Sequence, residues 1–182
     1  TASVGSNPGL TVTAMGDNVA TTMTITGAGS TTFTGAMSTA LTSVDGSSAT
    51  GALDLNVSSN TNNLSVTTGS GNDRVELGAL GTNFNSATND VVNLGDGTDT
   101  IVITDTSLTA GDITLIKAVT SAEVLELAST TAETTVDMNT VSVIDTLKAE
   151  GAITDATGAN GGAGIAGVAA NNAALIINGV ES

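Results

Sequence analysis

Two short segments, residues 69–73 and 95–99, carry the residue types that a hard cation such as calcium prefers. Their sequences are Gly-Ser-Gly-Asn-Asp and Gly-Asp-Gly-Thr-Asp, and each precedes a short apolar run. Calcium takes about six to eight oxygen ligands. Closely spaced glycines allow a tight turn to point its carbonyl groups inward, and the aspartate adds a carboxylate. Both segments therefore approach the nonapeptide G-G-x-G-x-D-x-U-x, in which U is a large apolar residue.

A third, degenerate copy of the pattern surrounds Asp90, nine residues before Asp99. Nine residues make the half-turn of a β-roll. This spacing predicts that Asp73 and Asp90 share one side of the roll, with one residue deleted between them, and that Asp99 faces the opposite side, with Asp96 in the same turn. The candidate calcium ligands are Gly69, Gly71, Asn72, Asp73, Asp90, Gly95, Asp96, Gly97 and Asp99.

The same clusters also have a plainer interpretation as solvated hairpin turns. Thr68 and Leu94 stand where the nonapeptide has its first glycine, so the sequence predicts one or two ions and no long series. The chain has 18 acidic and three basic residues and a net charge of −15, which favours a metal cation as the counter-charge. Among the other acids, Asp105 is interpreted as solubilising, and Glu123 and Glu126 as marking the exposed face of an apolar run.

Most of the chain has the patterning of strands. Apolar and polar residues alternate with a period of two, and clusters of Gly, Asn, Ser and Asp recur between the runs. With two Phe and neither Trp nor Tyr, a thin core of small aliphatic residues is expected. The predicted strands include Leu10–Val12, Met23–Ile25, Leu53–Val57, Leu64–Val66, Val75–Leu77 and Ala174–Asn178, and a short helix is predicted over Thr109–Val119.

These patterns predict an all-β fold, an elongated parallel β-helix or β-roll solenoid over about residues 10–150, with a β-sandwich as the alternative. Three regions are distinguished within what is expected to be one continuous domain. Residues 1–67 form a Thr/Ser-rich β region, residues 68–105 form the calcium-binding turns, and residues 106–182 hold the helix, the closing strands and a Gly/Ala-rich loop over 157–170.

In segments 69–73 and 95–99 and their setting, the sequence resembles the RTX-type calcium-binding repeat proteins, specifically the surface-layer (S-layer) proteins of Gram-negative bacteria. Segment 41–57 looks like strands that lead into such a roll, and segment 119–127 looks like its closing segment. The resemblance implies calcium bound between turns, secretion by a one-step type I pathway, and an extracellular, cell-surface location. It also implies a homo-oligomer or polymer, in the form of a sheet or filament, and a cell-surface polysaccharide as a partner.

The composition bears on several other function classes. The chain lacks His, Cys and Tyr, so we expect it not to be an enzyme. Its acidity would repel nucleic acid. The sequence contains no run of 18 apolar residues, so no membrane span is predicted. Residues 1–20 do not have the pattern of a signal peptide, and we interpret the chain as a processed or excised piece of a longer one.

Two alternatives to a structural polymer remain open at this stage. The first is a calcium-dependent RTX adhesin module that binds a glycan or a surface. The second is an ice-binding β-solenoid, because T-x-T patterns occur at residues 11–13, 22–26 and 32–34. The separations of these patterns are irregular, which suits ordinary β-branched surface positions better.

Overall fold

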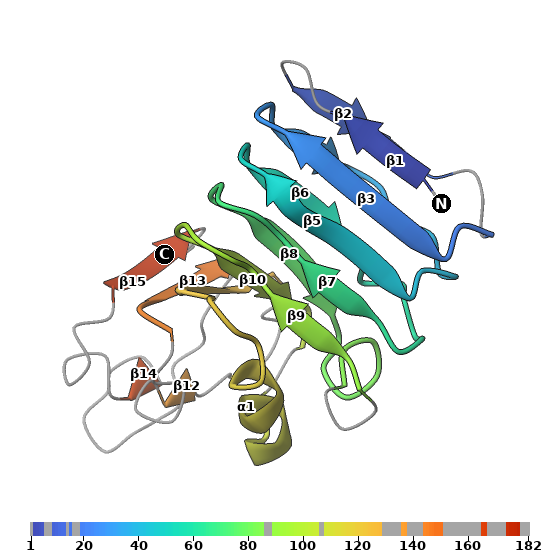
Figure 1. The fold of residues 1–182 in the computed structure, drawn as a ribbon. Coiled ribbons are helices and arrows are strands. Elements are labelled where there is room, and N and C mark those ends of the chain that lie inside the picture. The colour runs from blue at the N-terminus through green and yellow to red at the C-terminus, as the bar shows by residue number, and fades with distance from the viewer. Residues whose placement is uncertain are drawn as a thin grey trace.

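The chain folds as a parallel β-solenoid of about five turns. The computed structural model describes residues 2–5, 9–13, 15, 19–85, 89–105, 108–128, 136–137, 144–150, 165–166 and 174–178. From β1 (Ala2–Gly5) to β10 (Thr100–Ile103), successive strands alternate between two sheets, so that each of these coils contributes one strand to each (Figure 1). Every strand pair among these residues is parallel. The predicted solenoid is thus confirmed, and the β-sandwich alternative is wrong because its sheets would be antiparallel.

We name the two large sheets A and B. Sheet A has the strand order β1 (Ala2–Gly5), β3 (Thr22–Gly27), β5 (Ser43–Ala49), β7 (Ser65–Thr67) and β9 (Val91–Asn93). Sheet B has the order β15 (Ala174–Asn178), β13 (Thr146–Glu150), β11 (Val124–Leu127), β10 (Thr100–Ile103), β8 (Arg74–Gly78), β6 (Leu53–Asn56), β4 (Thr31–Phe33) and β2 (Leu10–Val12). A small third sheet pairs β12 (Val136–Asp137) with β14 (Ile165–Ala166).

The coils of this solenoid are longer than the 18 residues of a β-roll and vary in length. Hydrogen bonds that join equivalent positions of neighbouring coils span 20, 26 and 24 residues along sheet B. The turn from sheet A to sheet B is short and rich in glycine, whereas the loop that returns to sheet A is longer. The extra residues are accommodated mainly in these return loops, such as residues 79–90 between β8 and β9.

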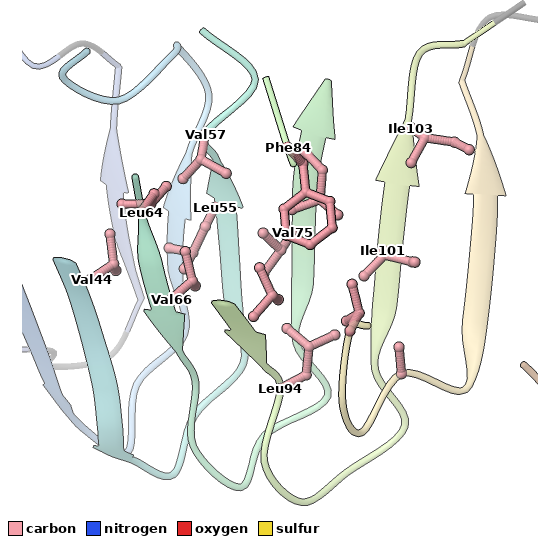
Figure 2. Close-up of a cluster of buried hydrophobic side chains, with 14 of the residues drawn as sticks. Val44, Leu55, Val57, Leu64, Val66, Val75, Phe84, Leu94, Ile101 and Ile103 are labelled. Carbon is pink, nitrogen blue, oxygen red and sulfur yellow. The ribbon is translucent and has the colours of Figure 1, made fainter. Parts of the chain in front are cut away.

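The core is a narrow layer of aliphatic side chains between the two sheets. The alternation seen in the sequence turns every second residue inward, as with Met23 and Ile25 in β3 and Leu53 and Leu55 in β6, all at most 2% exposed. Figure 2 shows side chains such as Val44 and Val66 gathered between the strands. Val, Leu and Ile fill so thin a layer without large aromatic side chains, which explains the composition.

Helix α1 (Ala110–Ile116) lies at the end of sheet A, beyond β9 (Figure 1), and confirms the predicted short helix. It begins with a capping box, in which the Thr109 side chain accepts the Asp112 N–H while the Asp112 carboxylate accepts the Thr109 N–H. Ile116 is completely buried against the core. Among the described residues, sheet A therefore ends at β9, and the next coil adds the isolated pairing of Asn93 with Thr120.

The predicted strands at residues 10–12, 23–25, 53–57, 64–66, 75–77 and 174–178 all overlap observed strands. Most of the Gly/Ala-rich segment 157–170 lies outside the described residues, and β14 falls within it. No helix among the described residues is long and apolar enough to cross a membrane.

A three-residue ionic network ties distant coils together on the outer face of sheet B. The Arg74 guanidinium contacts Glu126 Oε1 at 2.6 Å and Asp54 Oδ1 at 3.3 Å. The Glu126 side chain is only 10% exposed, whereas those of Arg74 and Asp54 are 38% and 40% exposed. Because β6, β8 and β11 belong to different coils, one cation joins three coils and compensates a nearly buried carboxylate.

We expect Arg74→Met to destabilise the protein by about 1–2 kcal/mol, because it leaves the Glu126 charge buried without its partner. Asp54→Asn should cost less than about 0.5 kcal/mol, since that partner is exposed. Urea denaturation of both variants measures the difference. Equal midpoints for Arg74→Met and the unchanged protein would show that the network contributes nothing.

Candidate metal centre

Three acidic side chains form a column where the tight turn enters sheet B. Asp73, Asp99 and Glu123 stand directly before β8, β10 and β11, and each accepts a backbone N–H from the preceding coil. The Leu53 N–H donates to Asp73 Oδ1 at 2.8 Å, and the Asp73 N–H donates to Asp99 Oδ1 at 2.7 Å. The Asp99 N–H donates to Glu123 Oε2 at 2.8 Å. The column therefore joins four successive coils.

The second carboxylate oxygens of Asp73 and Asp99 are what make this column a candidate cation site. The two residues are 1% and 0% exposed. Asp73 Oδ2 and Asp99 Oδ2 are buried and accept no hydrogen bond from the described part of the chain. A buried, unpaired carboxylate oxygen costs free energy unless it is protonated or binds a cation. Both oxygens are thus suited to be metal ligands.

The electrostatics of Asp99 point in the same direction. The pKa of Asp99 is raised to about 6, mainly by burial; the hydrogen bond from the Asp73 N–H opposes this shift, and the neighbouring charges of Asp73, Glu123 and Asp96 add to it. Three other carboxylates thus lie close enough to Asp99 to raise its pKa. At neutral pH their repulsion is unfavourable, and a bound cation would relieve it.

The glycines of both segments permit close stacking of successive turns. A Cβ at Gly97 would lie 2.1 Å from Gly71 O and 2.9 Å from Asp99 Oδ1, and one at Gly95 would lie 2.0 Å from Gly69 O. Gly95 and Gly97 also have φ angles of +79° and +145°, which favour glycine. Any side chain at these positions would push the coils apart.

Two of the predicted ligand groups are engaged in bonds between coils. Gly69 O accepts the Asp96 N–H at 2.9 Å, and Asn72 Oδ1 accepts the Thr98 N–H at 3.0 Å. The Asp96 side chain is exposed. In the part of the chain that the structure describes, no three acidic side chains converge closely enough to share one ion. Among the predicted ligands, Asp73 and Asp99 are the aspartates that keep a buried carboxylate oxygen without a hydrogen bond from the described residues.

The predicted placement of the three aspartates is wrong. Asp73 and Asp99 lie on the same side, one coil apart, and are joined by a hydrogen bond. Asp90 precedes β9 in sheet A, so it lies on the opposite side. Both of its oxygens are engaged, since Oδ1 accepts the Leu64 N–H and Oδ2 accepts the Asn85 N–H, each at 2.7 Å. The error arose from assuming coils of 18 residues, whereas Asp73 and Asp99 are 26 residues apart.

Sequence reasoning also missed two acids that bind the backbone of a neighbouring coil. Glu123 belongs to the column, and Asp105 Oδ2 accepts the Leu80 N–H at 2.9 Å. The sequence predicts only a solubilising role for Asp105 and an exposed face for Glu123 and Glu126; the latter prediction is also wrong for Glu126, which is 7% exposed. Asp73, Asp99 and Glu123 share one signal, an acid directly before an apolar strand of sheet B, which could have revealed Glu123.

The T-x-T patterns do not form one array in the described structure. Thr11 and Thr32 are paired on sheet B, where the next position is Asp54. Thr24 lies on sheet A, and its neighbour in the next strand is Asp45. Since ice binding would need a regular face over many coils, these positions are ordinary outward-facing threonines.

Fold and site together define a parallel β-solenoid protein with a column of acidic side chains that joins its coils. No protein-family model, curated protein or solved structure significantly matches the chain. Functional inference therefore depends on the chemistry of the solenoid itself.

Proposed function

We propose that this chain is a structural, self-assembling extracellular protein of a bacterial surface layer or a related surface polymer, stabilised by calcium and without enzymatic activity. The observation that carries the proposal is the pair of buried carboxylates, Asp73 and Asp99, each with one oxygen free of hydrogen bonds among the described residues. A divalent cation bound between the coils would supply the partner that these two buried oxygens lack.

The residues present fit calcium in part. Asp73 and Asp99 would hold the ion through their Oδ2 atoms, and Asp96 would contribute charge from the surface of the same turn. Calcium accepts such a set because it binds carboxylates, carbonyl groups and water in flexible geometry. Asp90, Asn72 and the carbonyl of Gly69 serve as links between coils and are left out of this ligand set.

Charge supports the structural role. A net charge of −15 makes copies of the chain repel one another, so close packing into a sheet or filament requires counter-ions. Bound calcium would lower this repulsion and stiffen the coils at once. Assembly would then depend on the ion, as the resemblance to surface-layer proteins implies.

A calcium-dependent adhesin module is the second candidate, and the outer face of sheet A favours it. Its rows are Thr24, Asp45, Thr67 and Asn93, and Thr22, Ser43, Ser65 and Val91. Hydroxyl and amide groups dominate these rows, which suits hydrogen bonding to a cell-surface polysaccharide. Saturable binding of a polysaccharide by a monomer would favour the adhesin over the polymer.

Electron microscopy with and without calcium tests the proposed function. At millimolar calcium we expect ordered sheets or filaments without any added ligand. Excess chelator should dissolve them, and magnesium should restore them poorly, because it demands stricter geometry and dehydrates reluctantly. Assemblies that persist unchanged in chelator would contradict the calcium dependence, and a monomer under all conditions would contradict the polymer.

A further inference from the structure

Sheet B continues for three strands beyond the last strand of sheet A. After β10, sheet B adds β11, β13 and β15, while sheet A ends at β9 among the described residues (Figure 1). On the sheet A side, the described part of the β11 coil joins β9 around Thr120, which bridges Asn93 and donates to Val92 O. β11 therefore depends strongly on its bonds to β10, and β13 and β15 are attached to the solenoid through β11.

Asp99 and Glu123 are at the centre of those bonds. The Glu123 carboxylate accepts the Asp99 N–H at 2.8 Å. In return, Asp99 O accepts the N–H groups of Glu123 and Val124 at 3.1 and 2.9 Å. Glu123 O then accepts the N–H groups of Asp145 and Thr146 at 2.8 and 2.9 Å. A continuous path thus runs from Asp99 in the candidate site to β11 and β13.

The free oxygens identify which end of this path would respond to a cation. Asp99 Oδ2 is buried and accepts no hydrogen bond from the described residues, whereas Asp99 Oδ1 and the Asp99 main chain are held by neighbouring coils. A cation bound at Oδ2 would fix the carboxylate without displacing these bonds. The Glu123 carboxylate would then hold the Asp99 backbone in place for the ion.

We propose that Glu123 is a positioning residue for the cation site at Asp73 and Asp99, and that occupancy of this site controls the docking of β11, and through it β13, onto β10. This inference rests on the calcium binding in the proposed function. It goes beyond both nonapeptide segments, since Glu123 lies outside them. The ion would here stabilise the attachment of the sheet B strands whose coils add no strand to sheet A among the described residues.

Hydrogen exchange measured by mass spectrometry, together with calorimetric calcium titration, tests this inference. In the unchanged protein, calcium should slow exchange in peptides that span β11 and β13 by about tenfold or more, with little effect on β3 and β5. Glu123→Gln keeps an acceptor oxygen but loses the charge. It should need about 10–100-fold more calcium for the same protection, the usual effect of changing a residue that supports a metal ligand.

Glu76→Gln is the matched control, because Glu76 lies in β8 and accepts a hydrogen bond from Asn56 but is not part of the column. It should keep the calcium midpoint of the unchanged protein. If Glu123→Gln also kept that midpoint, or lost protection equally at every calcium concentration, the positioning role would be wrong. If protection of β11 and β13 in the unchanged protein did not depend on calcium, the proposed control of docking by the ion would be wrong, whatever the variants showed.

The two proposals fail in different ways. Absence of ordered assemblies, with the calcium-linked protection intact, would remove the polymer and leave the role of Glu123 standing. Ordered calcium-dependent assemblies, with an unaltered calcium midpoint in Glu123→Gln, would remove the role of Glu123 and leave the polymer standing. No calcium binding at all would overturn the cation part of both.

Discussion

The Gly69→Ala variant is expected to lose the native fold. The added Cβ would lie 1.8 Å from Ala49 O, 2.8 Å from Ala49 C and 2.9 Å from Gly46 O, all main-chain atoms of the preceding coil. That backbone cannot retreat easily, because β5 is paired on both sides and the Ser70 N–H donates to Ala49 O. We expect a loss of at least about 4 kcal/mol, which circular dichroism and thermal melting would detect.

Gly111→Ala is the matched control, since the new methyl group would meet only Thr109 Oγ1 at 3.4 Å on helix α1. It should stabilise the protein by up to about 1 kcal/mol through helix propensity. Comparison of Gly69→Ala with Gly111→Ala also distinguishes a steric role of Gly69 from a role in calcium binding. If Gly69→Ala folded normally and lost only its response to calcium, the glycine would serve the ion, and the steric explanation would be wrong.

The glycines show where sequence reasoning was incomplete. The motif predicted glycines that allow a turn to bind calcium, and the structure adds that they stack on one another. A Cβ at Gly51 would lie 2.4 Å from Gly29 O, one at Gly71 would lie 2.7 Å from Gly51 O, and one at Gly97 would lie 2.1 Å from Gly71 O. Gly29 and Gly51 belong to no calcium motif, so stacking explains more of the glycines than ion binding does.

The fold class could be predicted because alternation is a local property of the chain. Runs such as Met23–Ile25 and Val75–Leu77 each predict an inward-facing pair of side chains, and small aliphatic residues indicate a thin core. The capping box at Thr109 and Asp112 is equally local and marks the start of α1. These features need no knowledge of which strands become neighbours.

The site could be predicted only in part, because it depends on register between coils. Asp73 and Asp99 were identified as candidate ligands, yet their contact follows from a coil of 26 residues, whose length is determined largely by the return loop at 79–90. Such a loop carries no periodic signal. Asp90 has the same residue type and lies nine residues from Asp99, but the structure places it on the opposite sheet. Glu123 has a local signal, since it directly precedes an apolar strand, but its bond to Asp99 again depends on the register between coils.

The Asp99→Asn variant is expected to reverse its stability order relative to the unchanged protein when calcium is added. The amide keeps an oxygen that can accept the Asp73 N–H and loses the buried charge. Without calcium at neutral pH, the variant should therefore melt at the higher temperature. With calcium at about 1,000 times its dissociation constant, the unchanged protein should gain about 4 kcal/mol and overtake a variant that gains little.

The dependence on pH without calcium follows from the pKa of Asp99. Burial raises this pKa from 3.8 to about 6, so the folded state binds the proton more tightly than the unfolded state. The contribution of Asp99 to stability is then fully present below about pH 4 and is lost as the pH rises to about 6. The melting temperature of the unchanged protein should thus fall progressively below that of Asp99→Asn across this window. Melting both proteins in chelator at several pH values measures the gap directly.

Asp45→Asn is the control for a general effect of charge, because Asp45 is exposed on β5 and its carboxylate accepts hydrogen bonds only from Ser47 among the bonds that the structure shows. Its calcium gain should equal that of the unchanged protein. A full calcium gain in Asp99→Asn would mean that the ion binds elsewhere. A gap between Asp99→Asn and the unchanged protein that stays constant from pH 4 to pH 6 would mean that Asp99 does not titrate in this window. Either result would show that the charge on Asp99 Oδ2 does not link the buried carboxylate pair to the stability of the solenoid.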